Sequence, residues 1–212
     1  MQYNEKQQEI MTAAEILFAN KGFSGTSVRE IAEAANINVA MISYYFTSKE
    51  GLMEAIFHQR MSTVTERLES LANNTELNPF EKLEILVDDY INKLINQHRF
   101  HKLMYFEQRL DQNPAIMKLM SKLKKTNGDL VARLVKEGQD KNYFKQDIDV
   151  SLMMHTLIGT IMHSFMNREY YREAHGMQDL TDEQFIDDYK AILKNYMKDL
   201  IKSLLSNERA KN

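Results

Sequence analysis

Apolar residues recur every three to four positions through most of the chain, which predicts an almost entirely helical protein. In residues 5–21, Ile10, Ala14 and Phe18 form one apolar stripe, and Gly22 follows the last turn. The 212 residues include only two prolines and seven glycines. We therefore expect an all-α fold that begins with a supporting helix at residues 5–21.

Residues 24–57 contain three closely spaced helix starts. Ser27 and Glu30 have the S-x-x-E spacing of a capping box, in which the two side chains satisfy each other's free backbone N–H groups. Thr47 and Glu50 repeat this spacing before a longer helix. Short helices placed so close together are expected to pack on one another.

The first short helix is expected to end near Ala35, because Asn36 and Asn38 favour a tight turn. Asn38 can then cap a second short helix that runs through Tyr45. Two short helices joined by a three-residue turn form the helix-turn-helix pattern, whose second helix enters the DNA major groove. The pattern therefore predicts a protein that reads DNA.

The remaining periodic segments predict six further helices, namely residues 48–72, 79–96, 99–110 and 114–138 and two strongly apolar helices that begin after Asp149 and Thr181. A polar loop at residues 172–181 is expected between the last two. We predict two domains: a helix-turn-helix DNA-binding domain at 1–57, and a larger helical ligand-binding and dimerisation domain at 58–212.

The last two helices are apolar over much of their circumference, which is typical of a buried or paired helix. Paired with their copies from a second chain, they would form a four-helix bundle and make a homodimer. The residues expected at this interface are Leu157, Ile161, Phe165, Tyr189, Ile192, Tyr196 and Leu200. The alternative is that both helices complete the core of a monomer.

Composition narrows the class of protein. The chain has 43% hydrophobic and 27% charged residues, so it is expected to fold. It has no cysteine, no apolar leader at its start and no apolar run near the ~20 residues that span a bilayer. We expect a soluble, cytoplasmic protein with no membrane partner.

The charge of the predicted DNA-binding domain is unusual. Residues 1–57 carry four Lys or Arg against seven Glu, a net charge of −3, whereas DNA-binding domains are commonly basic. Phosphate binding would then depend on hydroxyl groups, helix N-termini and a few local cations. The same charge favours one alternative function, a helical module that contacts protein.

A set of residues with family-specific spacing extends through this region: Phe18, Gly22, Phe23, Thr26, Ser27, Val28, Ile31, Ala32 and Ala35, then Ile42, Tyr45, Phe46, Lys49, Glu50 and Leu52. Over about residues 8–57 the pattern resembles the N-terminal domain of TetR (tetracycline-repressor-like) transcription regulators. The resemblance implies a homodimer that binds a palindromic operator in double-stranded DNA, usually represses, and lets go when a small-molecule effector binds the C-terminal domain.

The resemblance also implies a DNA-binding surface. Its residues are Thr26, Ser27, Asn38, Tyr45 and Lys49 near phosphates, and Val39, Ala40, Met41, Ser43 and Tyr44 facing bases or adjacent backbone. The family's usual turn glycine is replaced by Asn36, and its usual capping serine by Asn38. Since Val39 and Met41 offer no hydrogen bonds, direct readout must depend on Ser43, Tyr44 and apolar contacts with thymine methyl groups.

The middle of the chain is rich in Met and aromatic residues, which suits a pocket for a small apolar or amphipathic effector. The candidate lining residues are Tyr90, Met104, Tyr105, Glu107, Met120, Met154, His155 and Met162. Each Met can equally be an ordinary core residue, so the pocket is a prediction about the region.

Enzymatic function has no support in the sequence. His98 and His101 have a spacing that can hold a metal on one helical face, but no carboxylate lies at a convincing offset. No catalytic triad or nucleophile elbow stands out. We expect no cofactor and no metal. An all-helical binding protein or metalloenzyme that uses these two histidines remains an alternative.

Overall fold

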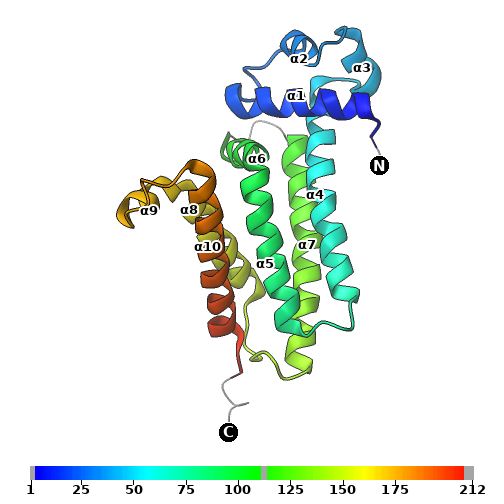
Figure 1. The fold of residues 1–212 in the computed structure, drawn as a ribbon. Helices are drawn as coiled ribbons and strands as arrows, with labels where there is room; N and C mark the ends of the chain where they lie inside the picture. The colour runs from blue at the N-terminus through cyan, green and yellow to red at the C-terminus, as the bar shows by residue number, and fades with distance from the viewer. Residues whose placement is uncertain (1–2, 111–113, 208–212) are drawn as a thin grey trace. The chain divides into compact units, whose positions relative to one another are not determined.

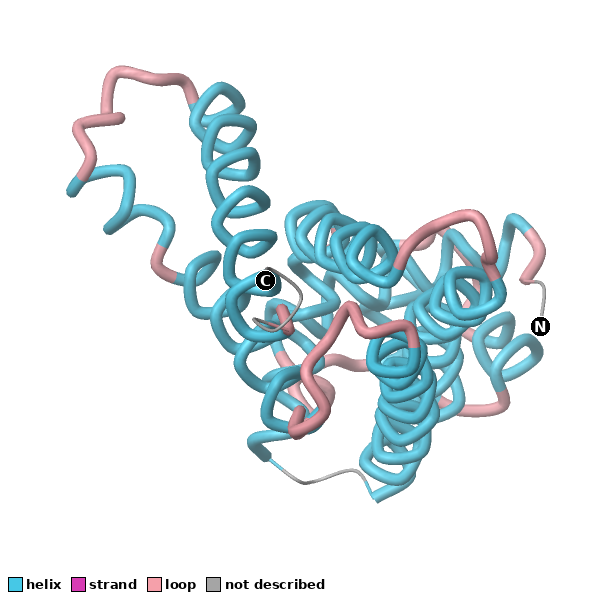
Figure 2. The backbone as a smooth tube through the Cα atoms, turned by 90° about the horizontal axis from the view of Figure 1, so that it is seen from below, coloured by secondary structure: helices cyan, strands magenta, loops and turns pink. Residues whose placement is uncertain are grey.

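The computed structural model describes residues 3–110 and 114–207, and it is helical almost throughout (Figures 1 and 2). Its helices are α1 (Glu5–Lys21), α2 (Val28–Ala34), α3 (Ala40–Phe46), α4 (Lys49–Asn73), α5 (Pro79–Asn96), α6 (His98–Leu110), α7 (Pro114–Asp140), α8 (Val150–Met166), α9 (Arg168–Ala174) and α10 (Asp182–Leu205). Within these described ranges there is no β-strand, only an isolated bridge between Phe144 and Ser206. The predicted all-α fold is confirmed.

The chain forms two compact units. Unit 1 contains Met1–Arg67 and Gln97–Asn127, and unit 2 contains Leu68–Asn96 and Gly128–Asn212. The chain passes from one to the other within α4, between α5 and α6, and within α7. The functional boundary predicted after residue 57 stays a prediction.

Unit 1 has one hydrophobic core that α1, α2, α3, α4, α6 and α7 share. Ile10 and Phe18 of α1 pack in the same buried cluster as Ile31 of α2 and Ile42 of α3. Near α6 the ring of Phe57 meets that of Phe100 edge-on, with centroids 5.1 Å apart. The short helices α2 and α3 depend on such packing for their stability, because helices of this length are marginally stable alone.

Unit 2 is organised around α5, α8 and α10. The inner face of α10 is a row of residues four apart: Phe185, Tyr189, Leu193, Met197, Ile201 and Leu205, all buried. Two ion pairs join α10 to α5, between Lys198 and Asp88 at 3.0 Å and between Lys202 and Glu84 at 3.2 Å.

Several predicted helix boundaries are confirmed because they depend on local capping chemistry. Ser27 with Glu30 and Thr181 with Gln184 form complete capping boxes at α2 and α10. The Asp149 carboxylate accepts the Leu152 N–H at the start of α8.

Two expectations are wrong. Thr47 does not cap α4: its φ of 69° ends α3, and the Ser48 hydroxyl accepts the Gly51 N–H instead. The predicted polar loop at 172–181 begins later, because residues 168–174 form the short helix α9. Arg172 holds the following loop by donating to the carbonyl groups of Met177 and Leu180.

Of the helices in the part of the chain that the structure describes, none combines the length and apolar character needed to cross a membrane.

Candidate DNA interface

The helix-turn-helix predicted from the sequence is present as α2 and α3, and we call α1–α3 (residues 5–46) the reading head (Figure 1). α2 begins at Ser27, whose hydroxyl accepts the Glu30 N–H at 3.2 Å while the Glu30 carboxylate accepts the Ser27 N–H at 2.8 Å. The helix ends after Ala34 and buries Ile31 and Ala32.

The turn between α2 and α3 is made by two asparagines. Asn36 has a φ of 51°, in the left-handed region that Asn tolerates better than most residues. The Asn38 side chain accepts the Ala40 N–H at 2.9 Å, which satisfies a donor at the start of α3. The N-cap of α3 is Val39, which has no side-chain cap, so Asn38 stabilises the turn one residue earlier and is not the helix cap that the sequence predicts.

α3 buries one face and exposes the other. Ile42 and Phe46 are buried in the core of unit 1, whereas Ala40, Ser43 and Tyr44 are exposed on the opposite side. Tyr44 is 79% exposed, the most of the large apolar side chains in the described residues. The edge of its ring meets the half-buried ring of Tyr45, with centroids 5.0 Å apart.

The exposed face of α3 is extended at both ends. Asn38 and Val39 are exposed before the helix, and Met41 is half-buried beside it. Thr47 is also exposed and lies three residues after Tyr44, which places it on the same helical side. The capping pattern in the sequence predicts Thr47 only as a helix cap, although its spacing from Ser43 and Tyr44 also places it on this side of α3.

Two residues predicted near phosphates have other contacts in the structure. Thr26 is 1% exposed, and its hydroxyl donates to the Gly22 carbonyl at 2.8 Å. The Lys49 ammonium donates to the carbonyl groups of Phe23 and Thr26, each at 2.9 Å. The Thr26 side chain is therefore not on the exposed surface, and Lys49 holds the turn between α1 and α2.

The Glu30 carboxylate has an unusual charge environment. A hydrogen bond from Lys21 at 2.6 Å, followed by those from the Ser27 N–H and hydroxyl, lowers the pKa of Glu30 to about 2. Glu30 is therefore ionised at neutral pH and paired with Lys21, which offsets part of the acidic charge of the reading head.

The compact unit that carries the reading head is positively charged overall. Residues 1–67 contain six Lys or Arg against eight Asp or Glu, but residues 97–127 contain seven against two, so unit 1 has a net charge of +3. Unit 2 carries the remaining 14 basic and 20 acidic residues, a net −6. The acidic reading head thus belongs to a unit whose net charge suits a phosphate backbone.

The structure divides the candidate effector residues between the two units. Met104, Tyr105, Glu107 and Met120 belong to unit 1, and Tyr90, Met154, His155 and Met162 to unit 2. Met120 and Glu107 are buried, whereas Tyr105 and His155 are exposed. Burial raises the pKa of Tyr90 to about 12. The structure does not gather these eight residues within one compact unit.

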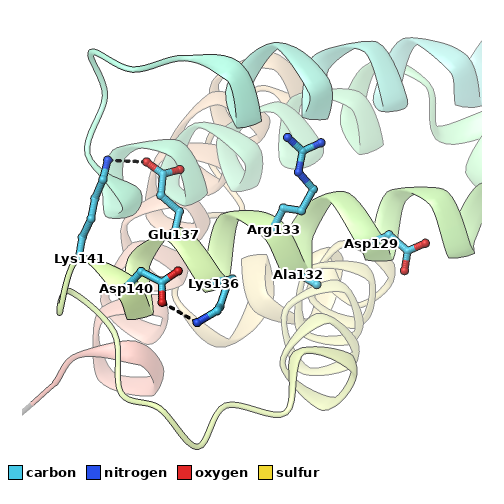
Figure 3. Close-up of a pocket in the computed structure, with 7 residues that line it drawn as sticks. All are labelled: Asp129, Ala132, Arg133, Lys136, Glu137, Asp140 and Lys141. Atoms are coloured by element: carbon cyan, nitrogen blue, oxygen red, sulfur yellow. Dashed lines mark hydrogen bonds and ion pairs between the residues drawn. The ribbon is translucent and has the colours of Figure 1, made fainter.

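An open recess of about 610 Å³ lies along the C-terminal half of α7 in unit 2 (Figure 3). Its lining is largely charged and consists of Asp129, Ala132, Arg133, Lys136, Glu137, Asp140 and Lys141. Lys136 pairs with Asp140 at 2.5 Å, and Lys141 with Glu137 at 2.7 Å. None of the predicted effector residues lines this recess. Among the described residues no group of three His, Cys, Asp or Glu is arranged to hold a metal.

The residues predicted at a dimer interface fall into two groups. Leu157, Ile161 and Tyr189 are buried within the chain, and the Tyr189 hydroxyl donates to the Ser164 carbonyl at 2.8 Å. Phe165 and Leu200 are partly buried. Ile192 and Tyr196 are 41% and 57% exposed, and Leu152 and Met166 on α8 are exposed as well.

Comparisons with known proteins cover almost the whole chain. Residues 10–56 match the model of bacterial regulatory proteins of the tetR family, and residues 57–186 match the C-terminal region of YsiA-like proteins. The chain is 32% identical over 172 residues to a probable HTH-type transcriptional regulator, YttP of Bacillus subtilis, covering 80% of this chain and 82% of that protein.

Two solved structures have the same fold. The ketosteroid transcriptional regulator KstR2 of Mycobacterium tuberculosis superposes with a TM-score of 0.72 at 22% identity and covers 98% of both chains. The regulator FadR of Bacillus subtilis, in complex with stearoyl-CoA, gives a TM-score of 0.69 at 21% identity, covering 92% of this chain and 97% of that one.

Proposed function

The chain belongs to the TetR family of bacterial transcriptional regulators, and we propose that it is a homodimeric repressor that binds a palindromic operator and is released by an apolar or amphipathic effector. Regulators of this family bind DNA through the N-terminal helix-turn-helix and respond to ligands. The operator, the dimer and the effector are the parts of the proposal that go beyond family membership.

The exposed face of α3 is the observation that carries the proposal. One face of α3 is exposed and carries Ala40, Ser43 and Tyr44, with Val39 exposed directly before the helix. The opposite face buries Ile42 and Phe46 in the core of unit 1. A rigid helix with one buried and one exposed face is the form in which side chains reach base edges. The Ser43 and Tyr44 hydroxyl groups are hydrogen-bonding groups, and Val39 and Ala40 suit thymine methyl groups.

A homodimer is supported by the outer surfaces of α8 and α10. Leu152 and Met166 on α8 and Ile192 and Tyr196 on α10 are large apolar side chains that remain exposed in the single chain. Gly159, seven residues from both Leu152 and Met166, adds no side chain, and a Cβ built on it has open space around it. Such a surface allows two helices to approach closely, as in the bundle of an obligate dimer.

An apolar effector is supported by the proteins to which the chain is similar. Two of the solved structures with this fold are a ketosteroid transcriptional regulator and a FadR in complex with stearoyl-CoA. Ketosteroids and stearoyl-CoA both have large apolar parts, which agrees with the Met-rich middle of this chain. Stearoyl-CoA is therefore the first effector probe to use.

Footprinting on the DNA upstream of the protein's own gene tests the proposal. We expect a protected inverted repeat with half-sites about one helical turn apart or a multiple of it. Adding stearoyl-CoA is expected to remove the protection. A protein that shows no protected site at low salt contradicts the DNA-binding part, and protection that survives every apolar effector contradicts the release part.

A further inference from the structure

The outer face of α8 has a symmetric arrangement of side chains about Gly159. His155 and His163 lie four residues before and after this glycine, and Leu152 and Met166 lie seven residues before and after it. At 3.6 residues per turn, all four side chains lie within about 40° of the direction in which Gly159 faces. This face therefore has the same order of residue types from either end: apolar, imidazole, glycine, imidazole, apolar.

Every member of this face is exposed in the single chain. Leu152 and Met166 are 63% and 62% exposed, and Gly159 and both histidines are exposed as well. In the part of the chain that the structure describes, the imidazoles of His155 and His163 make no hydrogen bond or ion pair; only the backbone carbonyl of His163 accepts, from Asn167. Both imidazoles are free to bind a partner.

A second copy of the chain is the occupant that this face fits. α8 contains no Asp, Glu, Lys or Arg, so two copies can approach each other without repulsion between like charges. α8 packs on α10, and its outer face adds to the exposed Ile192 and Tyr196 that support the proposed homodimer. A Cβ built on Gly159 has no atom within 4 Å, so a partner helix can approach α8 most closely at this residue.

The position of Gly159 determines what the two histidines meet. In a two-fold dimer the same surface of both subunits forms the contact, so α8 crosses its own copy at Gly159. His155 and His163 lie about 6 Å along the helix on either side of that crossing. If the two helices run antiparallel, His155 lies level with the partner's His163; if they run parallel, each histidine lies level with its own copy. Because the two spacings are equal, an imidazole meets an imidazole in both cases.

We propose that these imidazole pairs bind a divalent transition metal ion such as Zn²⁺, and that the metal strengthens the homodimer. Imidazole nitrogen is a preferred ligand of Zn²⁺, and water completes its coordination where the protein supplies few ligands. Each of the two sites takes one imidazole from each subunit. Neither site exists in a single chain, which agrees with the finding that the described residues contain no metal-binding group of three.

The inference rests on the homodimer of the proposed function and adds a metal ion that the sequence does not predict. It assigns His155 to the subunit interface in place of the effector contact expected from the sequence. Its test needs neither operator nor effector, because the measured quantities are the crossing point of the helices and the strength of the dimer.

Cysteine crosslinking tests the crossing point. The chain has no cysteine, so Gly159→Cys introduces a single thiol, and we expect mild oxidation to give a disulfide-linked dimer on a non-reducing gel. Gly128→Cys on α7 is the matched control, because a Cβ built on Gly128 also has open space around it. We expect this control to stay monomeric on the gel. No crosslink in Gly159→Cys, or equal crosslinking in both variants, overturns the inference.

Sedimentation equilibrium tests the metal site. It gives the dimer dissociation constant of each protein in EDTA and in excess zinc chloride. We expect zinc to lower this constant for the wild type by about tenfold or more, because an ion that binds only the dimer stabilises it by mass action. The double variant His155→Ala with His163→Ala should lose the response, whereas His98→Ala, which removes an exposed histidine of α6, should keep it. Circular dichroism checks that each variant is folded.

The outcomes separate the inference from the proposed function. A wild-type dimer with the same dissociation constant in zinc and in EDTA overturns the metal site and leaves the homodimer standing. A zinc response that survives in the double variant also overturns the site, since the metal then binds elsewhere. A wild-type protein that stays monomeric in both EDTA and zinc contradicts the homodimer of the proposed function together with the inference.

Discussion

Lys49 and Phe23 are joined by two interactions, a hydrogen bond of 2.9 Å from the ammonium to the carbonyl and a contact of 4.2 Å from the ammonium to the ring centroid. Together with the second hydrogen bond to Thr26, they use the ammonium to fasten α4 to the turn before α2. The structure thus provides a function for Lys49 inside the fold, beside the phosphate contact that the family resemblance implies.

Replacing Lys49 separates these two functions. We expect Lys49→Met to lower the free energy of unfolding by about 1–3 kcal/mol, because two charge-assisted hydrogen bonds are lost. Operator affinity is expected to fall while the dependence of log K on log salt keeps its slope. A slope reduced by about one unit would identify a direct phosphate contact instead. Lys6→Met, which removes an exposed ion pair on α1, should change neither the free energy of unfolding nor the operator affinity.

Tyr44 provides the clearest test of the exposed α3 face. Because it is 79% exposed, Tyr44→Ala is expected to leave stability unchanged but to weaken specific operator binding by about 1–3 kcal/mol. Tyr44→Phe measures how much of this loss in binding free energy is due to the hydroxyl group. The measurement is anisotropy with operator and with a scrambled duplex; the control is Tyr170→Ala, an exposed tyrosine on α9. Equal losses in both tyrosine variants would contradict base readout by Tyr44.

The dimer proposal is tested on α10. Ile192→Glu together with Tyr196→Glu places two charges on the exposed side of the helix, so we expect the protein to sediment as a monomer and to lose operator affinity. Since the buried row from Phe185 to Leu205 is untouched, the helical circular dichroism signal should remain. Tyr170→Glu is the control for a charge added at an exposed aromatic residue elsewhere in unit 2. A double variant that still sediments as a dimer shows that the interface lies on another surface.

Local chemistry explains what could be predicted from the sequence. The capping boxes at Ser27 and Thr181 and the Asp149 cap involve groups within three residues of one another, so their spacing alone specifies them. Thr47 and Ser48 show the limit of this reasoning. Both are hydroxyl residues at the end of α3, and the positive φ of Thr47 decides that Ser48 caps α4.

Contacts between distant segments could not be predicted in this way. The spacing around Glu107 indicates an α6 helix, but nothing local specifies that α6 packs on α1 and that Glu107 is buried. On α10 the apolar positions occupy more than one side, and only packing against α5 and α8 shows that Leu193 and Met197 face inward while Ile192 and Tyr196 remain exposed.

Glu107 and Glu30 are expected to affect stability with opposite dependence on pH. Burial raises the pKa of Glu107 above its ordinary 4.5, so the folded state favours the protonated acid and pays for ionisation as pH rises. Below pH 4.5 that penalty is absent. Glu107→Gln should therefore be more stable than wild type at neutral pH, and its advantage should disappear as pH falls toward 4.5.

Glu30 provides the opposite case within the same unit. The hydrogen bond from Lys21 and those from Ser27 lower its pKa to about 2, so the charged form stabilises the fold above pH 4.5 and this contribution is lost as pH falls from 4.5 toward 2. Glu30→Gln should be less stable than wild type at neutral pH, with a deficit that shrinks in acid. Thermal melting of Glu107→Gln, Glu30→Gln and wild type between pH 3 and 8 gives the difference in stability between each variant and wild type. If both differences have the same sign at neutral pH, one of the two carboxylates does not have the environment described for it.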